Sequence, residues 1–294
     1  QTLFSAYANG FLFEMPGGTA MGGIGVEWRE DDIDSIPDDV ARDGLFFGFF
    51  SDGGATGSKW TRELFGEIEL PILAGRVGAE ELTLNVSGRY TDDEFYGSDT
   101  TYSGKLGWRP IPSLLLRGTY GTSFRAPNVR EVFLQDQTGF LNVFDPCLIP
   151  EDALDPITGG YVPELDNRDP VVLENCFRTG IDPTQFENSG FNTYSTEIAR
   201  GGTADLLAET STSYTWGFAF EQPWFEAFDM TFGMTWYDIE IEDAIVEPTP
   251  QFLVNDCYND PQFDSAFCDA IARADDGFFD IIDGKYINRD EARN

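Results

Sequence analysis

The residues Leu82-Thr83-Leu84-Asn85-Val86-Ser87-Gly88-Arg89-Tyr90 alternate between an apolar or glycine position and a polar one. A period of two residues places successive side chains on opposite faces of a β-strand. The same pattern recurs in the segments 102–109, 114–125, 213–220 and 228–237, and in weaker form in 11–15, 24–29 and 63–70. The sequence therefore predicts an all-β chain with about eight strands, each with one apolar and one polar face.

The polar face of these strands carries charges in mid-strand, including Glu63, Glu67 and Arg117. In a soluble β-sandwich the polar face would meet water and the apolar face would fill the core. In a membrane barrel the apolar face meets lipid and the polar face meets a wet interior. Alternation alone is compatible with both arrangements.

The lengths of the connections favour the barrel. Short turns are predicted at 16–18, 73–78, 110–113 and 221–227, a medium one at 92–99, and long loops at 31–58, 127–208 and after 246. Short turns on one rim and long loops on the other are typical of outer-membrane barrels. Aromatic residues near the strand ends are predicted to form interfacial girdles: Trp28, Trp60, Tyr90, Trp108, Tyr120, Phe124 and Trp236.

The composition excludes several classes of function. Acidic residues number 52 against 18 Lys plus Arg, a net charge of -34, so an electrostatic nucleic-acid binder is excluded. The chain contains no His, which removes His-based triads and HExxH zinc sites. Paired carboxylates such as Asp31-Asp32 are expected by chance in so acidic a chain, so we predict no catalytic residue, no cofactor and no metal ligand. Asp275-Asp276-Gly277 is compatible with calcium or, more simply, with a solvated turn.

The four cysteines, Cys147, Cys176, Cys257 and Cys268, all lie after residue 140. An even count in an acidic, Lys-poor chain indicates two disulfides and an oxidising compartment. Free or metal-binding thiols are the alternative, although no CxxC spacing is present. One disulfide within each of the two last long loops is our hypothesis.

The segment Gly118-Thr119-Tyr120-Gly121-Thr122-Ser123-Phe124-Arg125-Ala126-Pro127-Asn128-Val129-Arg130-Glu131-Val132-Phe133 resembles a motif of TonB-dependent outer-membrane receptors. In that family a strand ends in Ser-Phe-Arg-Ala-Pro-Asn and Glu-Leu-Phe begins a short helix; here Val132 replaces the Leu. Pro127 would end the strand, and Asn128 would cap the helical turn. The motif positions are Ser123, Phe124, Arg125, Ala126, Pro127, Asn128, Glu131 and Phe133.

Two more segments extend the resemblance over about residues 10–294. Residues 209–217 with 235–245 are similar to the next hairpin of the family. Residues 257–268, with Asp276-Gly277 and Tyr286-Ile287-Asn288, look like the disulfide-bearing loop of a receptor subgroup with large extracellular loops. Cys147 and Cys176 fit the same subgroup.

The resemblance implies that residues 1–294 form about eight strands of a 22-stranded antiparallel transmembrane β-barrel in the bacterial outer membrane, with 127–208 and 246–294 as extracellular loops. The family also has an N-terminal plug, a segment that touches TonB, and a last strand ending in an aromatic residue. Neither the plug nor the TonB-contacting segment is visible here, and the chain ends at Asn294, where another strand is expected to start. We therefore expect an internal piece of a longer chain.

The function implied by the resemblance is active transport, energised through TonB, of a ferric siderophore, cobalamin or an oligosaccharide. The expected partners are outer-membrane lipid, lipopolysaccharide, the TonB complex and this cargo. A non-transporting adhesin or surface receptor and a soluble carbohydrate-binding β-sandwich are the alternatives. The candidate ligand contacts are loop aromatics: Phe140, Phe144, Tyr161, Phe177, Phe186, Phe191 and Tyr194.

The basic residues in mid-strand have two possible roles. Arg89, Lys105, Arg117 and Arg125 could contact a plug or a ligand. Alternatively, they pair with carboxylates across the wall of the barrel interior, namely Glu63, Glu67 and Glu69.

Overall fold

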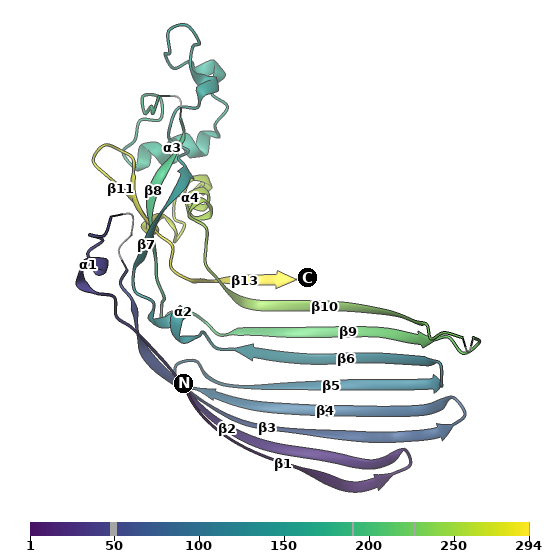
Figure 1. The fold of residues 1–294 in the computed structure, drawn as a ribbon. Helices are drawn as coiled ribbons and strands as arrows, with labels where there is room; N and C mark the ends of the chain where they lie inside the picture. The colour runs from purple at the N-terminus through teal and green to yellow at the C-terminus, as the bar shows by residue number, and fades with distance from the viewer. Residues whose placement is uncertain (48–51, 190, 226, 294) are drawn as a thin grey trace.

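A computed structural model describes residues 1–47, 52–189, 191–225 and 227–293. Its largest element is a nine-stranded antiparallel sheet in the order β1-β2-β3-β4-β5-β6-β9-β10-β13, strongly curved and open at both edges (Figure 1). The strands are β1 Thr2–Met15, β2 Gly18–Ser35, β3 Ala55–Arg76, β4 Ala79–Asp93, β5 Gly97–Ile111, β6 Leu114–Arg125, β9 Glu209–Glu221, β10 Thr231–Val246 and β13 Ile287–Arg293.

The strand registers place like side chains together, as the alternation predicts. On one face Leu84 pairs with Leu106, and further along the sheet Trp216 pairs with Trp236. On the other face Ser87 pairs with Ser103, and their hydroxyls lie 2.8 Å apart. The large apolar side chains are exposed, since no second sheet in the described part of the chain packs against this one. The β-sandwich alternative is therefore wrong.

The strand count and several predicted boundaries need correction. The prediction of about eight strands is one short for this sheet, because residues 287–293 return as β13, which pairs with β10. The loop predicted at 31–58 spans only 36–54, and the medium connection at 92–99 shrinks to 94–96. Both shorten because the polar ends of the strands continue the backbone ladder beyond the apolar residues that signal it. β10 begins at Thr231 rather than at Phe228, so its turn covers 222–230.

The connections divide between the two rims of the sheet (Figure 1). Residues 16–17, 77–78, 112–113 and 222–230 turn at one rim. Residues 36–54, which include α1 (Asp39–Arg42), and residues 94–96, 126–208 and 247–286 connect strands at the other rim. The last two of these connections, 126–208 and 247–286, form one folded unit there, which we call the lobe.

A second sheet lies within the lobe, in the order β11-β12-β8-β7. Its strands are β7 Gln137–Phe144, β8 Thr193–Arg200, β11 Ile271–Arg273 and β12 Phe279–Asp283. The lobe helices are α2 Val129–Phe133, α3 Pro170–Arg178 and α4 Pro250–Asn259, with 3₁₀ turns η1 Glu151–Ala153, η2 Pro163–Leu165 and η3 Cys268–Ala270. Because β12 pairs in parallel with β8, the two loops share a single sheet.

Two helical features bear on the predictions. The amphipathic stretch Phe263–Ile271 predicts a short helix from sequence, and this prediction is wrong, because that segment holds only the 3₁₀ turn η3 before β11 begins. The helix lies earlier, at α4, where the Thr249 hydroxyl accepts from the amide of Phe252 and Pro250 starts the first turn. In the described residues, none of the helices combines the length and apolar character needed to cross a bilayer.

Candidate functional site

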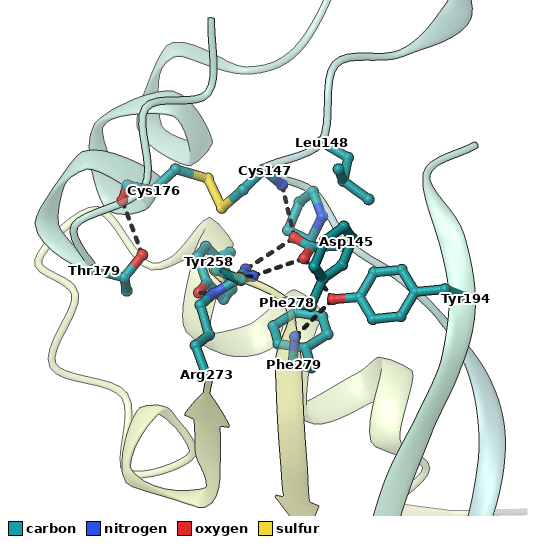
Figure 2. A network of polar contacts seen from close by, with 12 residues as sticks. Asp145, Cys147, Leu148, Cys176, Thr179, Tyr194, Tyr258, Arg273, Phe278 and Phe279 are labelled. Atoms are coloured by element: carbon teal, nitrogen blue, oxygen red, sulfur yellow. Dashed lines mark hydrogen bonds and ion pairs between the residues drawn. A yellow bond between two sulfur atoms is a disulfide. The ribbon is translucent and has the colours of Figure 1, made fainter. Parts of the chain in front are cut away.

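A buried ion pair joins the two loops at the centre of the lobe (Figure 2). The Arg273 guanidinium donates from Nη1 and Nη2 to the two carboxylate oxygens of Asp145, at 2.7 and 2.8 Å. Tyr194 donates its hydroxyl to the same carboxylate at 2.8 Å. The ring of Phe279 lies 4.1 Å from the guanidinium carbon. Asp145 is fully buried and Arg273 nearly so, so this charge pair is sealed from water.

Burial and the neighbouring Asp145 carboxylate raise the pKa of the Tyr194 hydroxyl far above its usual value of 10.0. Tyr194 therefore stays neutral and keeps donating to Asp145. The Tyr194 hydroxyl oxygen also accepts a hydrogen bond from the backbone amide of Phe279 at 2.8 Å. Both charged groups of the cluster, the Arg273 guanidinium and the Asp145 carboxylate, therefore have hydrogen-bond partners. This arrangement is that of a structural joint between the loops rather than of a reactive centre.

Two disulfides close the loops individually. Cys147 bonds to Cys176, and Cys257 bonds to Cys268. The prediction of two disulfides, one within each long loop, is confirmed. The sulfurs lie in a compact apolar core with residues from both loops: Val143, Val172, Ile198, Leu253, Val254, Tyr258, Phe279 and Ile282.

The Ser-Phe-Arg-Ala-Pro-Asn motif lies where β6 leaves the large sheet for the lobe. The Arg125 guanidinium pairs with Glu131 at 3.0 Å and also with Glu209 on the neighbouring strand β9. Asn128 caps α2 by accepting from the amides of Arg130 and Glu131, and the Glu131 side chain accepts from the amide of Asn128 in return. The predicted cap is therefore confirmed, and the motif ties α2 to two strand ends.

A second buried ion pair supports the same corner. The Lys59 ammonium donates to the carbonyl oxygen of the motif residue Pro127 at 2.6 Å and lies 2.8 Å from Asp93. Both side chains are at least 95% buried. Phe133, the last motif residue, packs edge-on against Phe95 at 6.0 Å and over Gly57. Ser123 is also engaged, with its hydroxyl 2.6 Å from that of Ser211, while Phe124 and Ala126 are half-buried.

The polar face of the sheet has a hollow of about 380 Å³ beside Tyr7, Phe65 and Glu67. Tyr7 donates its hydroxyl to Glu67 at 3.1 Å and stacks on Phe65, with ring centres 6.1 Å apart. Gly25 makes this possible, because a Cβ there would lie 2.4 Å from the Phe65 ring. The Arg89 guanidinium carbon lies over the Phe65 ring, 4.8 Å from the ring centre.

The prediction that the mid-strand basic residues pair with Glu63, Glu67 and Glu69 is confirmed only in part. Arg89 pairs with Glu63 at 2.6 Å, as predicted. Arg125 instead pairs with Glu131 and Glu209, and Arg117 donates to the Thr235 hydroxyl at 2.8 Å. Within the described residues, no three metal-binding side chains of the types His, Cys, Asp or Glu come together.

The model of the family described as TonB dependent receptor-like, beta-barrel matches residues 2–294. The chain belongs to the TonB-dependent receptor family. Its members are outer-membrane β-barrels that act as transporters and receptors rather than enzymes, so the location of this chain is the outer membrane. The open nine-stranded sheet is part of such a barrel.

Individual relatives match more distantly. The receptor segment is 36% identical over 74 residues to the vitamin B12 transporter BtuB of Vibrio cholerae, covering 25% of this chain and 11% of that protein. It superposes on the ferric enterobactin receptor PfeA of Pseudomonas aeruginosa with a TM-score of 0.54 and 14% identity, covering 98% of this chain and 31% of that one. The Serratia marcescens hemophore receptor HasR was solved with its hemophore HasA and heme. It superposes with a TM-score of 0.54 and 14% identity, covering 99% of this chain and 38% of that one.

This receptor segment therefore spans about a third of the solved relatives and a ninth of the curated one. The solved structures, at 14% identity, show the fold alone.

The seven loop aromatics predicted to contact ligand fall into two groups in the receptor lobe. Tyr194 and Phe186 pack against the core, and Tyr161 donates to Asp166 at 2.8 Å. The other four are at least 39% exposed: Phe140 and Phe144 on β7, Phe177 on α3, and Phe191 before β8. The joint Asp145–Arg273 was missed from sequence, because 128 residues separate its members and no local pattern connects them.

Proposed function

We propose that this chain is part of an outer-membrane transporter that takes up a scarce or bulky nutrient, such as a ferric siderophore, cobalamin or an oligosaccharide, with energy supplied through TonB. The observation that carries the proposal is the lobe, which two long loops build at one rim of the sheet and which two disulfides and a buried ion pair hold together. The family membership supports uptake, and the relatives named above are a vitamin B12 transporter, a ferric enterobactin receptor and a hemophore receptor. No catalytic step is assigned to the chain.

In this proposal the segments 127–208 and 246–286 face the outside of the cell and receive the cargo. Four exposed aromatic side chains stand on a framework fixed by two disulfides and the Asp145–Arg273 pair. Aromatic groups on a rigid support lose little conformational entropy on binding, so they make effective contacts. The acidic loops would also lie next to lipopolysaccharide, whose phosphates are bridged by divalent cations.

The test is equilibrium binding by the full-length receptor, purified from outer membrane in detergent. Ferric siderophores, cyanocobalamin and oligosaccharides are titrated in turn, and uptake of the bound compound is then measured in cells with and without TonB. Phe177→Ala and Phe191→Ala are expected to weaken binding about fivefold each, the loss of one stacking contact of about 1 kcal/mol. Ile157→Ala is the matched control, because Ile157 is 92% exposed on the same lobe but is not aromatic.

The outcomes separate the candidates. Binding followed by TonB-dependent uptake supports the transporter. Binding without uptake in either strain identifies a non-transporting surface receptor. Absence of binding to all three classes, with a folded receptor, contradicts the proposal.

A further inference from the structure

The turn between β9 and β10 carries an unusual set of exposed apolar side chains. Trp224 is 70% exposed and Phe225 60% exposed, while Phe228 and Met230 are each 53% exposed. The other turns at this rim are only two residues long, at 16–17, 77–78 and 112–113, and contain no aromatic residue. Closing a hairpin therefore does not account for these side chains.

The described residues of this turn, 222–225 and 227–230, are internally ordered around Gln222. Its side-chain oxygen accepts from the amides of Trp224 and Phe225 at 3.0 and 2.8 Å. Its side-chain nitrogen donates to the carbonyls of Phe225 and Phe228 at 2.7 and 2.8 Å. The rings of Phe225 and Phe228 stack with centres 5.6 Å apart. One amide thus satisfies four backbone groups, as a turn in an apolar medium requires.

The aromatic cluster is continuous with the apolar face of the sheet. Trp224 lies 5.6 Å from Phe220, ring centre to ring centre. Phe220 pairs with Phe232 across the strands, and Phe232 lies 5.7 Å from Phe218. Phe218 belongs to the face that, in an outer-membrane barrel, meets lipid. The turn therefore extends the lipid-facing surface past the end of the strands, where Trp side chains favour the boundary between acyl chains and headgroups.

We propose that residues 222–225 and 227–230 form a lipid anchor, in which Trp224, Phe225 and Phe228 insert into the bilayer leaflet at the short-turn rim. The partner is membrane phospholipid. The other hairpins of this rim end in water, so the anchor fixes the depth of the barrel wall at one place, next to β9 and β10.

Spin-label accessibility tests this inference in the full-length receptor reconstituted into phospholipid vesicles. All four cysteines of this chain are paired in disulfides, so Ala227→Cys introduces the one free thiol of this segment for a nitroxide. Val77→Cys is the matched control, because Val77 is fully exposed in the β3–β4 turn of the same rim. The anchor predicts that the label at 227 collides more often with oxygen, which partitions into lipid, than with a water-soluble nickel complex, and that the label at 77 does the reverse.

Two results would overturn the anchor. Equal access of the nickel complex at 227 and 77 places the turn in water. Protection of 227 from both reagents indicates that a protein, either another subunit or a second copy, covers the turn. A double change of Trp224→Ser and Phe225→Ser is expected to move the 227 label toward the behaviour of 77. If the Ala227→Cys protein does not fold, quenching of Trp224 by brominated phospholipid, compared with Trp224→Phe, gives the same answer.

Discussion

Arg273 and Asp145 lie 128 residues apart in sequence, yet they form the most buried charge pair of the lobe. Removing water from two charges is costly, and the bidentate geometry together with Tyr194 offsets that cost. The pair therefore contributes little net stability as a whole. Each member, however, depends strongly on the other, because either one alone would be an uncompensated buried charge.

Arg273→Ala is expected to destabilise the lobe by about 3–5 kcal/mol, since it leaves the Asp145 carboxylate buried without its cation. Hydrogen exchange of lobe peptides in the purified receptor measures this loss. Arg200→Ala is the control: Arg200 pairs with Glu247 at 2.6 Å in an exposed setting, where such pairs contribute about 0–1 kcal/mol. Similar losses for the two variants would contradict the assigned role of the joint.

The carboxylate of Asp166 gives the lobe a pH dependence. The adjacent Arg168 guanidinium lowers the pKa of Asp166 from 3.8 to about 2. Because the folded-state pKa is lower than the unfolded one, the stabilisation is fully present above pH 3.8 and is lost as the pH falls towards 2. The ionised Asp166 carboxylate stabilises the folded lobe by about 2 kcal/mol. Hydrogen exchange of peptides around 145–185 is expected to differ between wild type and Asp166→Asn at pH 6 and to converge near pH 2, whereas a constant difference would contradict this assignment.

At the scale of the elements, glycine determines what fits on the polar face of β2. Gly23 and Gly25 leave room for the Tyr7 and Phe65 side chains, which lie across this strand from the strands on either side. Two glycines in an alternating strand indicate that another group lies close to the backbone of that strand. It does not reveal which neighbours approach, because those come from β1 and β3.

Gly25→Val is expected to destabilise the sheet by about 1–3 kcal/mol, because the new side chain would displace the Phe65 ring and Tyr7. The temperature at which the barrel loses its compact migration in detergent gels measures the effect. Gly104→Val on β5 serves as the control, since a Cβ there meets nothing within 4 Å. An equal decrease at both positions would indicate a general cost of losing glycine rather than a specific steric conflict.

The strands and helices that could be predicted from sequence are those that a pattern of neighbouring residues defines. The alternation predicted the strands of the large sheet other than β13, and Pro127-Asn128 predicted the end of β6 and the cap of α2. The helix α4 was missed, although Thr249-Pro250 is a helix-start signal, because the apolar spacing of Phe263–Ile271 is the stronger local pattern and indicates the wrong segment. The lobe strands were missed for different reasons: β11 and β12 are short, β7 pairs with β8 from the far end of the same loop, and β12 pairs with β8 of the other loop.

At the scale of the whole molecule, the two faces of the large sheet meet different surroundings. The apolar face, with Leu106 and Trp216, has no protein against it in the described residues, whereas Ser103 and Glu67 line the hollow of the polar face. Sequence alternation defined the two faces but not their environments. Membership of an outer-membrane family assigns lipid to the apolar one.

Leu106→Arg is expected to destabilise the membrane-inserted barrel by about 2–4 kcal/mol, because it places a charge on the lipid face. Ser103→Arg, three residues away on the opposite face and near Glu67, is expected to cost much less. The yield of heat-modifiable receptor in outer-membrane fractions compares the two. A greater loss for Ser103→Arg would mean that the assignment of the faces must be reversed.

Each disulfide closes within one loop, so no disulfide links the two loops of the lobe. Oxidation of the first pair needs nothing from the second, and the two reactions can occur in either order during biogenesis. The two loops are joined instead by noncovalent contacts, namely the Asp145–Arg273 pair and the parallel β8–β12 ladder, so their association is a docking step.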